Sequence, residues 1–270
     1  MTNQNDQFVR IILCRHGQSK GNVDPSLYIQ HGDSNIGLTD LGWEQAYHLG
    51  VFLKSYYQAN GVTGWPRVNL SPYVRTQETL AALLFGMEGT FPGEPGKLFE
   101  DPRLTEKFFG AASALAFPPE GCDPDVIRTL ELLSSHVHKG DRLSAAHLFG
   151  ESTKLTQGFV KSFMDGTLDR AVREGHREFL FVVHGAIIQA FIANWSHAQL
   201  RHKDLIGNPN NCDAIEIKGT PKNWTITKIY DGEKREPANR NMIEGVSRLT
   251  VADLPPVPDF IRALKAAGPV

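Results

Sequence analysis

The chain has 270 residues and a formal net charge of −2, so it lacks the excess of positive charge that would draw it to nucleic acid or to an anionic membrane. With 41% hydrophobic residues it is ordinary for a globular protein, and any anion site must be built locally. The length allows one large α/β domain and does not require a second.

The cysteines and the N-terminal residues indicate a cellular compartment. Cys14, Cys122 and Cys212 are scattered and odd in number, which argues against a disulfide framework or a metal-ligand spacing and suits a reducing cytoplasm. Residues 1–7 are polar and lack the basic and apolar regions of a signal peptide. No apolar run approaches the ~18 residues that a membrane span needs. We therefore expect a cytoplasmic protein.

The first predicted element is a buried strand, the apolar run from Phe8 to Cys14. It leads directly into Arg15, His16 and Gly17, at the end of a strand where ligands bind in open α/β sheets. Arginine offers a fork of donors suited to phosphate oxygens, histidine can act as a nucleophile, and glycine lets the backbone approach a ligand. On its own, however, the triplet is equally compatible with an ordinary strand end, because short motifs match by chance.

Further along the chain, strand and helix patterns alternate. Residues 17–37 are expected to form a long loop over the strand end, and Thr39 is expected to be the N-cap of a helix with an apolar face. Later strands are predicted at 68–70, 97–100 and 179–183, helices after residue 71 and at 151–164, 186–195 and 260–267, and a hairpin at 212–217 and 224–229.

This alternation predicts an α/β fold with three αβα layers, in which a mainly parallel central sheet has helices on both faces. Residues 111–150 have the least regular pattern and are expected to form an inserted cap-like segment. In the helix at 151–164, we expect Leu155, Phe159 and Phe163 to share the buried face.

Several predicted strand ends carry residues suited to bind an anion. The first strand ends in Arg15 and His16, the second leads to Arg75, and the strand at 179–183 ends in His184. Because parallel strands place their carboxyl ends side by side, we expect these side chains to converge on one crevice. Two guanidiniums and two imidazoles form a pocket for a dianion without any metal ligand set.

At this point the chain resembles the histidine phosphatase superfamily (branch 1), the phosphoglycerate mutase-like and acid phosphatase-like proteins. The matches follow one another in the family's order from about residue 9 to 217, which makes chance very improbable. They are Leu-x-Arg-His-Gly-x-Ser-x-x-Asn at 13–22, Leu-Thr-x-x-Gly-x-x-Gln-Ala at 38–46, Ser-Pro-x-x-Arg-Thr-x-x-Thr at 71–79, Leu-x-Glu-x-x-Phe-Gly at 104–110, Gly-Glu-Ser at 150–152, Val-x-His-Gly at 182–185 and Asn-Pro-x-Asn-Cys at 208–212.

The resemblance implies a role for each matching residue. His16 would be the nucleophile that becomes phosphorylated, Glu106 the proton donor to the leaving alkoxide, and Ser71 would lie behind His16. No metal and no cofactor is implied. The substrate phosphoryl group would be held by Arg15, Asn22, Arg75, His184 and Gly185.

The resemblance also implies a domain organisation and an activity. A histidine phosphatase domain would cover 1–230 with an insertion at about 107–150, and 231–270 would form a C-terminal extension packed on it. The expected activity is metal-independent hydrolysis of a small phosphomonoester through a phosphohistidine, with no nucleic-acid or membrane partner.

Two alternatives stay open, a cofactor-dependent phosphoglycerate mutase and a module that binds phosphorylated ligands without turnover. A mutase keeps a tryptophan before the asparagine of the first motif, where this chain has Gly21, and carries extra basic residues after the acid motif. Here Lys107 is the only cation between 107 and 124. A module that only binds has no need of Glu106 beside His16. Phe108, Phe109 and Trp195 are expected to lie in the core.

Overall fold

One mixed sheet of seven strands organises the fold, in the order β3-β2-β4-β1-β5-β6-β7. The computed structural model describes residues 8–93, 95–110, 121–129, 131–132, 150–197, 207–220, 223–244 and 256. The first four strands pair in parallel and the last three pair antiparallel, which confirms the mainly parallel central sheet and the late hairpin. The strands are β1 (Val9–Arg15), β2 (Arg67–Leu70), β3 (Phe99–Glu100), β4 (Glu178–Val183), β5 (Ala214–Thr220), β6 (Asn223–Asp231) and β7 (Glu236–Asn241).

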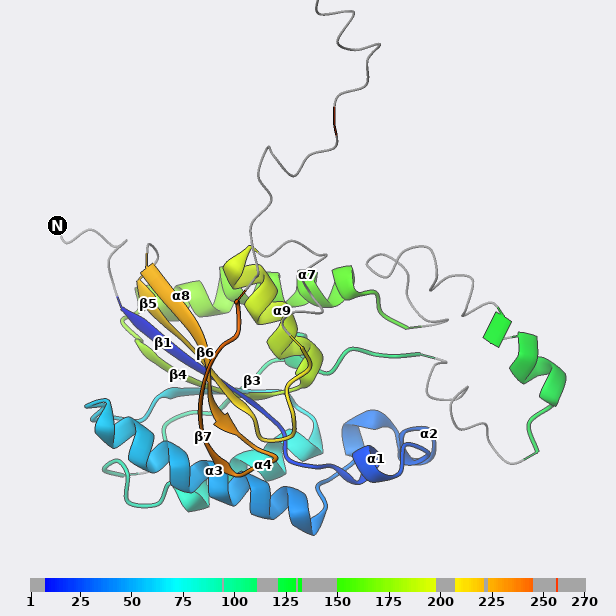
Figure 1. Cartoon of the computed structure of the whole chain (residues 1–270), viewed down its shortest axis with the longest axis horizontal. Helices are drawn as coiled ribbons and strands as arrows, with labels where there is room; N and C mark the ends of the chain where they lie inside the picture. The colour runs from blue at the N-terminus through cyan, green and yellow to red at the C-terminus, as the bar shows by residue number, and fades with distance from the viewer. Residues whose placement is uncertain are drawn as a thin grey trace, which may run out of the picture.

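Helices cover both faces of this sheet, as the sequence predicts (Figure 1). The long helices α3 and α4 lie on one side, and α7 and α9 lie on the other with the short α8 (Figure 1). A π-helical turn, η4, connects α7 to α8. The helices are α3 (Asp40–Ala59), α4 (Val74–Gly86), α7 (Thr153–Phe163), η4 (Met164–Leu168), α8 (Asp169–Arg173) and α9 (Gly185–Ser196).

The central strands are apolar because they are buried on both faces. Along β1, Ile11 and Leu13 pack into the core beneath α7 and α9, while Ile12 and Cys14 pack into the core beneath α3 and α4. Side chains of a strand alternate between its two faces, so the part of a strand that is covered on both sides is apolar at successive positions, as residues 11–14 are. This is why the runs at β1 and β4 are continuous rather than alternating.

The segment at 17–37 differs from the loop that we expected. It folds into two short helices and a 3₁₀ turn, α1 (Lys20–Val23), α2 (Leu27–His31) and η2 (Asp33–Asn35). A reciprocal cap starts α1, because the Ser19 side chain accepts from the Asn22 backbone and the Asn22 side chain accepts from the Ser19 backbone. The expectation of a loop missed this local signal, while the predicted N-cap at Thr39 is confirmed.

The predicted apolar face of α7 is wrong at two of its three positions. Phe163 is buried, but Leu155 is 46% exposed and Phe159 is 40% exposed. Ser152 caps the helix with its hydroxyl, and the buried side of α7 carries Thr153, Thr156, Val160 and Phe163. Polar threonines therefore occupy the side that packs on α9, where the sequence pattern favoured leucine and phenylalanine.

The predicted insertion and the predicted last helix lie largely outside the described residues. Of 111–150, the structure describes 121–129, 131–132 and 150, and residues 124–129 are helical. The helix expected at 260–267 is not among the described residues. Within the described part of the chain, no helix combines the length and the apolar character needed to cross a bilayer.

Packing in the core predicts how much stability is lost when a buried side chain is truncated. Phe181 of β4 is fully buried between Phe163 and Phe191, so Phe181→Ala leaves a large cavity and should lower the free energy of unfolding by about 3–5 kcal/mol. The control is Phe85→Ala on α4, where the ring is 69% exposed and the change should stay within about 0.5 kcal/mol. Urea denaturation of both variants measures the difference, and equal losses would contradict this assignment of the core.

Candidate active site

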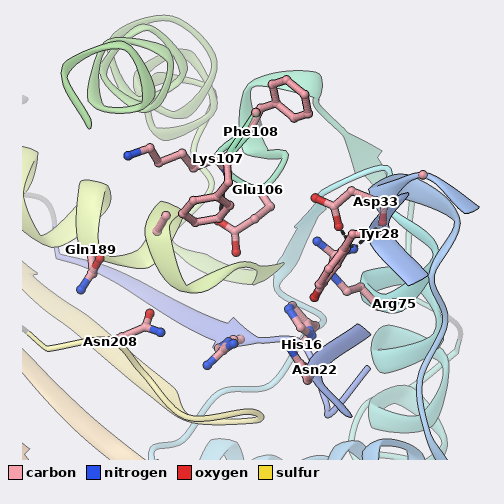
Figure 2. A pocket seen from close by; sticks show the side chains of 15 residues that line it. His16, Asn22, Tyr28, Asp33, Arg75, Glu106, Lys107, Phe108, Gln189 and Asn208 are labelled. Atoms are coloured by element: carbon pink, nitrogen blue, oxygen red, sulfur yellow. Dashed lines mark hydrogen bonds and ion pairs between the residues drawn. The ribbon is translucent and has the colours of Figure 1, made fainter. Parts of the chain in front are cut away.

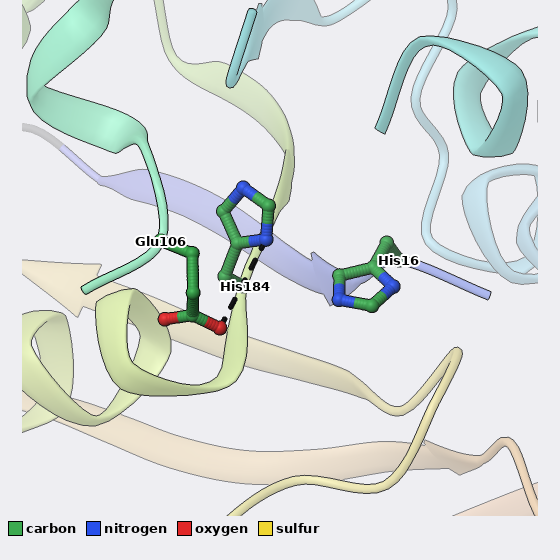
Figure 3. Close-up of side chains that lie close together, drawn as sticks. All are labelled: His16, Glu106 and His184. Carbon is green, nitrogen blue, oxygen red and sulfur yellow. Dashed lines mark ion pairs between the residues drawn. The ribbon is translucent and has the colours of Figure 1, made fainter. Parts of the chain in front are cut away.

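The register of two parallel strands brings the two motif histidines together. Arg15 at the end of β1 lies opposite Val183 at the end of β4, so the next residues, His16 and His184, leave the sheet side by side. Their ring centroids are 5.2 Å apart, with the planes at 63°. Both rings are buried, and Glu106 approaches them from a separate segment (Figure 3).

The hydrogen bond of His16 fixes which of its nitrogens can attack. Nδ1 lies 2.7 Å from the carbonyl oxygen of Gly17, and because a carbonyl only accepts, Nδ1 carries the proton. The lone pair is then on Nε2. Burial lowers the pKa of His16 well below its ordinary value, and the nearby guanidiniums of Arg75 and Arg15 lower it further. His16 is therefore a neutral imidazole with an available nitrogen at neutral pH.

His184 is held from behind by a serine. Its Nε2 lies 2.8 Å from the hydroxyl oxygen of Ser71, and the Tyr73 ring packs edge-on against it at 5.1 Å. Ser71, which the resemblance placed behind His16, thus bonds the ring of His184. The other nitrogen, Nδ1, is buried without a hydrogen-bond partner among the described residues and lies 4.0 Å from Oε2 of Glu106. Burial also lowers the pKa of His184, followed by the charge of Arg75, so this contact joins a neutral ring to the carboxyl group.

Two guanidiniums flank the histidines, each tied at one end. Arg15 donates from Nη1 to the carbonyl oxygen of Pro209 at 2.6 Å, and Arg75 donates from Nη1 to the main-chain oxygen of Asp33 at 2.6 Å. Arg75 is 1% exposed. Within the described structure, Nε of both arginines is buried and has no hydrogen-bond partner. An anion between them would satisfy these donors, as buried polar groups require.

Asn22 has a defined amide orientation. Its Oδ1 accepts from the backbone N–H of Ser19 at 3.0 Å and from Nδ2 of Asn211 at 3.1 Å. With the oxygen engaged twice, the NH₂ group of Asn22 is the part left to meet an anion in the cavity. The same Asn211 amide also donates to the main-chain oxygen of His16 at 3.0 Å, which couples the two residues.

Gly185 must be a glycine for a packing reason. It is the first residue of α9, directly after His184, and a Cβ there would lie 2.2 Å from Oδ1 of Asn208. The absence of a side chain lets the loop that carries Asn208 lie against the N-terminus of α9, where backbone N–H groups favour an anion.

Glu106 has the environment of a proton donor. Burial raises the pKa of its carboxyl group, against the opposing effects of the Lys107 backbone N–H, which donates to Oε1 at 2.9 Å, and of Arg75 and Arg15. A raised pKa keeps more of the group protonated, and a dianionic phosphate nearby would raise it further. Glu106 can therefore hold a proton beside the two histidines.

These side chains line one cavity of about 560 Å³ (Figure 2). Of the residues expected at the site, Arg15, His16, Asn22, Arg75 and Glu106 face it directly, and His184 packs behind His16. The remaining lining residues are Tyr28, Gly32, Asp33, Lys107, Phe108, Phe109, Gly110, Ala186, Gln189 and Asn208.

Some of these residues were missed or misplaced by the sequence analysis. Phe108 and Phe109, expected in the core, are 53% and 43% exposed and line the cavity, whereas Trp195 does pack against the core. The motif at 208–212 was a signal for Asn208, and Gln189 lies one turn after Gly185 on α9. Nothing in the sequence pattern singled out Tyr28 or Asp33.

Tyr28 occupies the space above Gly21. A Cβ on Gly21 would lie 2.6 Å from Cζ of the Tyr28 ring, so a larger residue at 21 and the present position of Tyr28 exclude each other. The tyrosine hydroxyl points toward His16 and Arg75 (Figure 2). The glycine that departs from the mutase pattern thus makes room for a tyrosine in the cavity.

One group of described residues has the composition of a metal site. His16, Glu106 and His184 each offer one ligand atom, and these atoms lie within 4.8 Å of one another (Figure 3). The adjacent guanidiniums of Arg15 and Arg75 oppose a cation there and favour an anion. The electrostatics of the cavity therefore suit a phosphoryl group better than a divalent ion.

The chain resembles known proteins in sequence and in fold. A sequence model of the histidine phosphatase superfamily (branch 1) matches residues 11–232. Phosphoglycerate mutase-like protein AT74 of Arabidopsis thaliana is 27% identical over 222 residues, which are 76% of this chain and 63% of that protein. Phosphoglycerate mutase-like protein AT74H of the same plant is 26% identical over 226 residues, 76% of this chain and 72% of that protein. The chain thus spans less than two thirds of AT74.

Solved structures share the fold at low sequence identity. A phosphoglycerate mutase from Bacillus anthracis has a TM-score of 0.60 at 20% identity, covering 86% of this chain and 97% of that one. A putative alpha-ribazole-5'-P phosphatase from Escherichia coli has a TM-score of 0.59 at 20% identity, covering 86% and 96%. A mycobacterial glucosyl-3-phosphoglycerate phosphatase has a TM-score of 0.55 at 19% identity, covering 81% and 97%. With the match over residues 11–232, the chain belongs to the histidine phosphatase superfamily, branch 1.

Proposed function

We propose that the protein is a metal-independent phosphatase that hydrolyses small phosphomonoesters through a phosphohistidine on His16. The observation that carries the proposal is the meeting, in one cavity, of a neutral imidazole with a free Nε2, two buried guanidiniums with unpartnered Nε groups, and a carboxyl group with a raised pKa. Each of the three answers one requirement of phosphoryl transfer: a nucleophile, a clamp for charge and a proton for the leaving group.

In the first step, Nε2 of His16 attacks phosphorus and the bond from phosphorus to the ester oxygen breaks. Glu106 gives its proton to that oxygen, which leaves as an alcohol, and the carboxylate remains. Arg15 and Arg75 hold the phosphoryl oxygens throughout, since charge stabilisation and alignment are what this transfer mainly needs. The result is phosphohistidine, a carboxylate and a free alcohol.

In the second step, the Glu106 carboxylate takes a proton from a water molecule as its oxygen attacks phosphorus. The bond from phosphorus to Nε2 breaks, and the electron pair returns to the imidazole of His16. Inorganic phosphate leaves, and both residues are back in their starting protonation states. The second step is the reverse of the first with water in place of the alcohol, so by microscopic reversibility the group that donated the proton now accepts one.

A phosphoglycerate mutase is the second candidate, favoured by the names of the plant relatives. Against it stand Gly21, whose space is taken by the Tyr28 ring, and the lack of a run of basic residues after Glu106. A mutase must retain the phosphoryl group and grip a second anionic group on its substrate, and these departures weaken both functions. Hydrolysis is therefore the better supported outcome.

The experiment that tests the proposal is phosphate release from a panel of phosphomonoesters with a chelator present. The panel includes 3-phosphoglycerate, glycerol 3-phosphate, sugar phosphates and an aryl phosphate. Release that survives the chelator supports a metal-independent phosphatase. Release that requires an added divalent ion would contradict it. No phosphate release, together with isomerisation of phosphoglycerate, would favour the mutase.

His16, as the proposed nucleophile, should be indispensable for turnover. His16→Ala should lower kcat by at least about 10³-fold, because the covalent route is lost. Circular dichroism should show an unchanged fold, and His48→Ala, an exposed histidine on α3, should keep full activity. Phosphate release at the wild-type rate from His16→Ala would end the assignment of the nucleophile.

Removal of the proton donor should depend on the leaving group. Glu106→Gln cannot protonate an alkoxide, so we expect hydrolysis of alkyl phosphates to slow by about 10²–10⁴-fold. Aryl phosphates leave without that proton and should lose far less in the phosphorylation step. The measurement is kcat/KM on one alkyl and one aryl ester, and an equal loss on both would show that Glu106 is not the acid.

The pH profile follows from the two pKa shifts. The reactive form has neutral His16, whose pKa is lowered, and protonated Glu106, whose pKa is raised. Activity should therefore fall as pH decreases through the pKa of His16 and fall as pH increases through that of Glu106. In Glu106→Gln, assayed as kcat/KM on the same aryl phosphate so that ionisation of the substrate is common to both, the Glu106 part of the alkaline limb should disappear. An unchanged limb would assign it to another group.

A further inference from the structure

One charged residue of the cavity has no part in the proposed chemistry. Asp33, in the 3₁₀ turn η2, has Oδ1 2.8 Å from Nη1 of Arg75, and the same Nη1 donates to the Asp33 main-chain oxygen. The side chain of Asp33 is 23% exposed and lies on the cavity wall beside Tyr28 (Figure 2). A carboxylate therefore stands next to the guanidinium that is proposed to bind the phosphoryl group.

The local backbone keeps this carboxylate in place. Gly32, directly before it, has a φ of 75°, a backbone conformation that residues other than glycine rarely adopt. The turn is closed by the Asn35 backbone N–H, which donates to the Gly32 oxygen at 3.2 Å, and by the Asn35 side chain, which donates to the His31 oxygen at 3.1 Å. Together with the two contacts to Arg75, these bonds fix Asp33 at the wall.

Once substrate is bound, the charges on the described lining residues no longer fully balance the negative charge of Asp33. Arg15 and Arg75 together balance a dianionic phosphoryl group, and Glu106 is neutral while it holds its proton. Two charged groups then remain, Asp33 and Lys107. Because the positive charge of Arg75 is then shared between the phosphoryl group and Asp33, it offsets the negative charge of Asp33 only in part.

Lys107 does not offset it, because the two side chains lie on opposite sides of Glu106 (Figure 2). The Lys107 ammonium extends toward α7, where Nζ is 3.5 Å from Oγ1 of Thr153 and 5.7 Å from the centre of the Phe109 ring. The charge of Asp33, in contrast, acts on the proton donor: burial is the main cause of the raised pKa of Glu106, and Asp33 adds a smaller effect in the same direction. Glu106 marks the position of the leaving-group oxygen.

We propose that Asp33 selects against phosphomonoesters whose leaving group carries a negative charge, so that the site prefers esters of neutral alcohols. The inference rests on the proposed function and narrows its substrate class. A carboxylate or a second phosphate on the leaving group would meet the Asp33 carboxylate in a confined site, where like charges repel. Hydroxyl groups meet no such repulsion and can donate to the same oxygens.

The test uses two esters that differ mainly in this charge. Glycerol 3-phosphate and 3-phosphoglycerate share a three-carbon skeleton, and the second carries a carboxylate in place of a hydroxymethyl group. Wild-type enzyme should have the higher kcat/KM for glycerol 3-phosphate. Asp33→Asn should shift the ratio by at least about tenfold toward 3-phosphoglycerate, because one like charge anywhere within about 10 Å has an effect of at least this size at an effective dielectric constant of about 20.

Two matched variants control for other effects. Asp33→Glu keeps the charge and should keep the wild-type ratio. Asp24→Asn removes one charge from an exposed position outside the cavity lining and should also leave the ratio unchanged. If Asp33→Asn lowers kcat/KM on both esters by the same factor, Asp33 only positions Arg75, and the selectivity proposal is overturned.

A binding measurement separates this inference from the proposed hydrolysis. Calorimetric titration of the two esters into His16→Ala, and into His16→Ala combined with Asp33→Asn, reads the selectivity without turnover. If wild-type enzyme releases no phosphate but the Kd ratio shifts as expected, the phosphatase proposal fails while the selectivity stands. If wild-type enzyme releases phosphate but the Kd ratio of the two esters does not change with Asp33→Asn, the phosphatase proposal stands and the selectivity proposal fails. If neither ester binds, both proposals are overturned.

Discussion

The parallel register of β1 and β4 is the constraint on which the site depends. Pairing Arg15 with Val183 makes His16 and His184 the first residues beyond the sheet on adjacent strands, and it sets their rings 5.2 Å apart. The register is strongly specified because both faces of both strands are buried, and a slip by one residue would exchange the side chains of the two cores. Packing far from the cavity thus fixes the relative positions of the two histidines.

The electrostatics of the cavity rest on the same burial. Histidines removed from water beside two guanidiniums remain neutral, whereas a carboxyl group removed from water tends to keep its proton. Both shifts suit phosphoryl transfer, and they need no metal ion to produce them. The cost of burying Arg75 is reduced by Asp33, which leaves the other edge of its guanidinium to meet an anion.

The antiparallel half of the sheet supports the site through one loop. Asp213, at the start of β5, is buried, pairs with Lys228 at 2.9 Å and accepts from the backbone N–H groups of Asn210 and Gly232. These bonds hold the residues before β5, from which Asn211 bonds the main-chain oxygen of His16 and Asn22. The hairpin strands therefore hold residues 208–213 beside His16, although these strands contribute no residue to the lining of the cavity.

The sequence by itself determined the sheet, the two helical layers and the group of residues that meet in the cavity. Short continuous apolar runs between turn signals are typical of central strands, and residues at the carboxyl ends of parallel strands converge, so Arg15, His16, Arg75 and His184 could be placed together from the sequence. The order of short motifs identified the family, and with it Glu106, which does not directly follow a predicted strand and was found through the motif at 104–110.

Only the tertiary structure decided what faces the cavity from irregular segments. Asp33 and Tyr28 lie in a stretch without apolar periodicity, and their positions depend on the Ser19–Asn22 cap, on the missing side chain of Gly21 and on contacts with Arg75 from another part of the chain. Likewise, Phe108 is expected in the core because it is apolar, but its segment leaves the sheet, and the residue is exposed at the edge of the cavity. Periodicity reports burial in regular elements, whereas contacts between distant loops are set by how those elements pack.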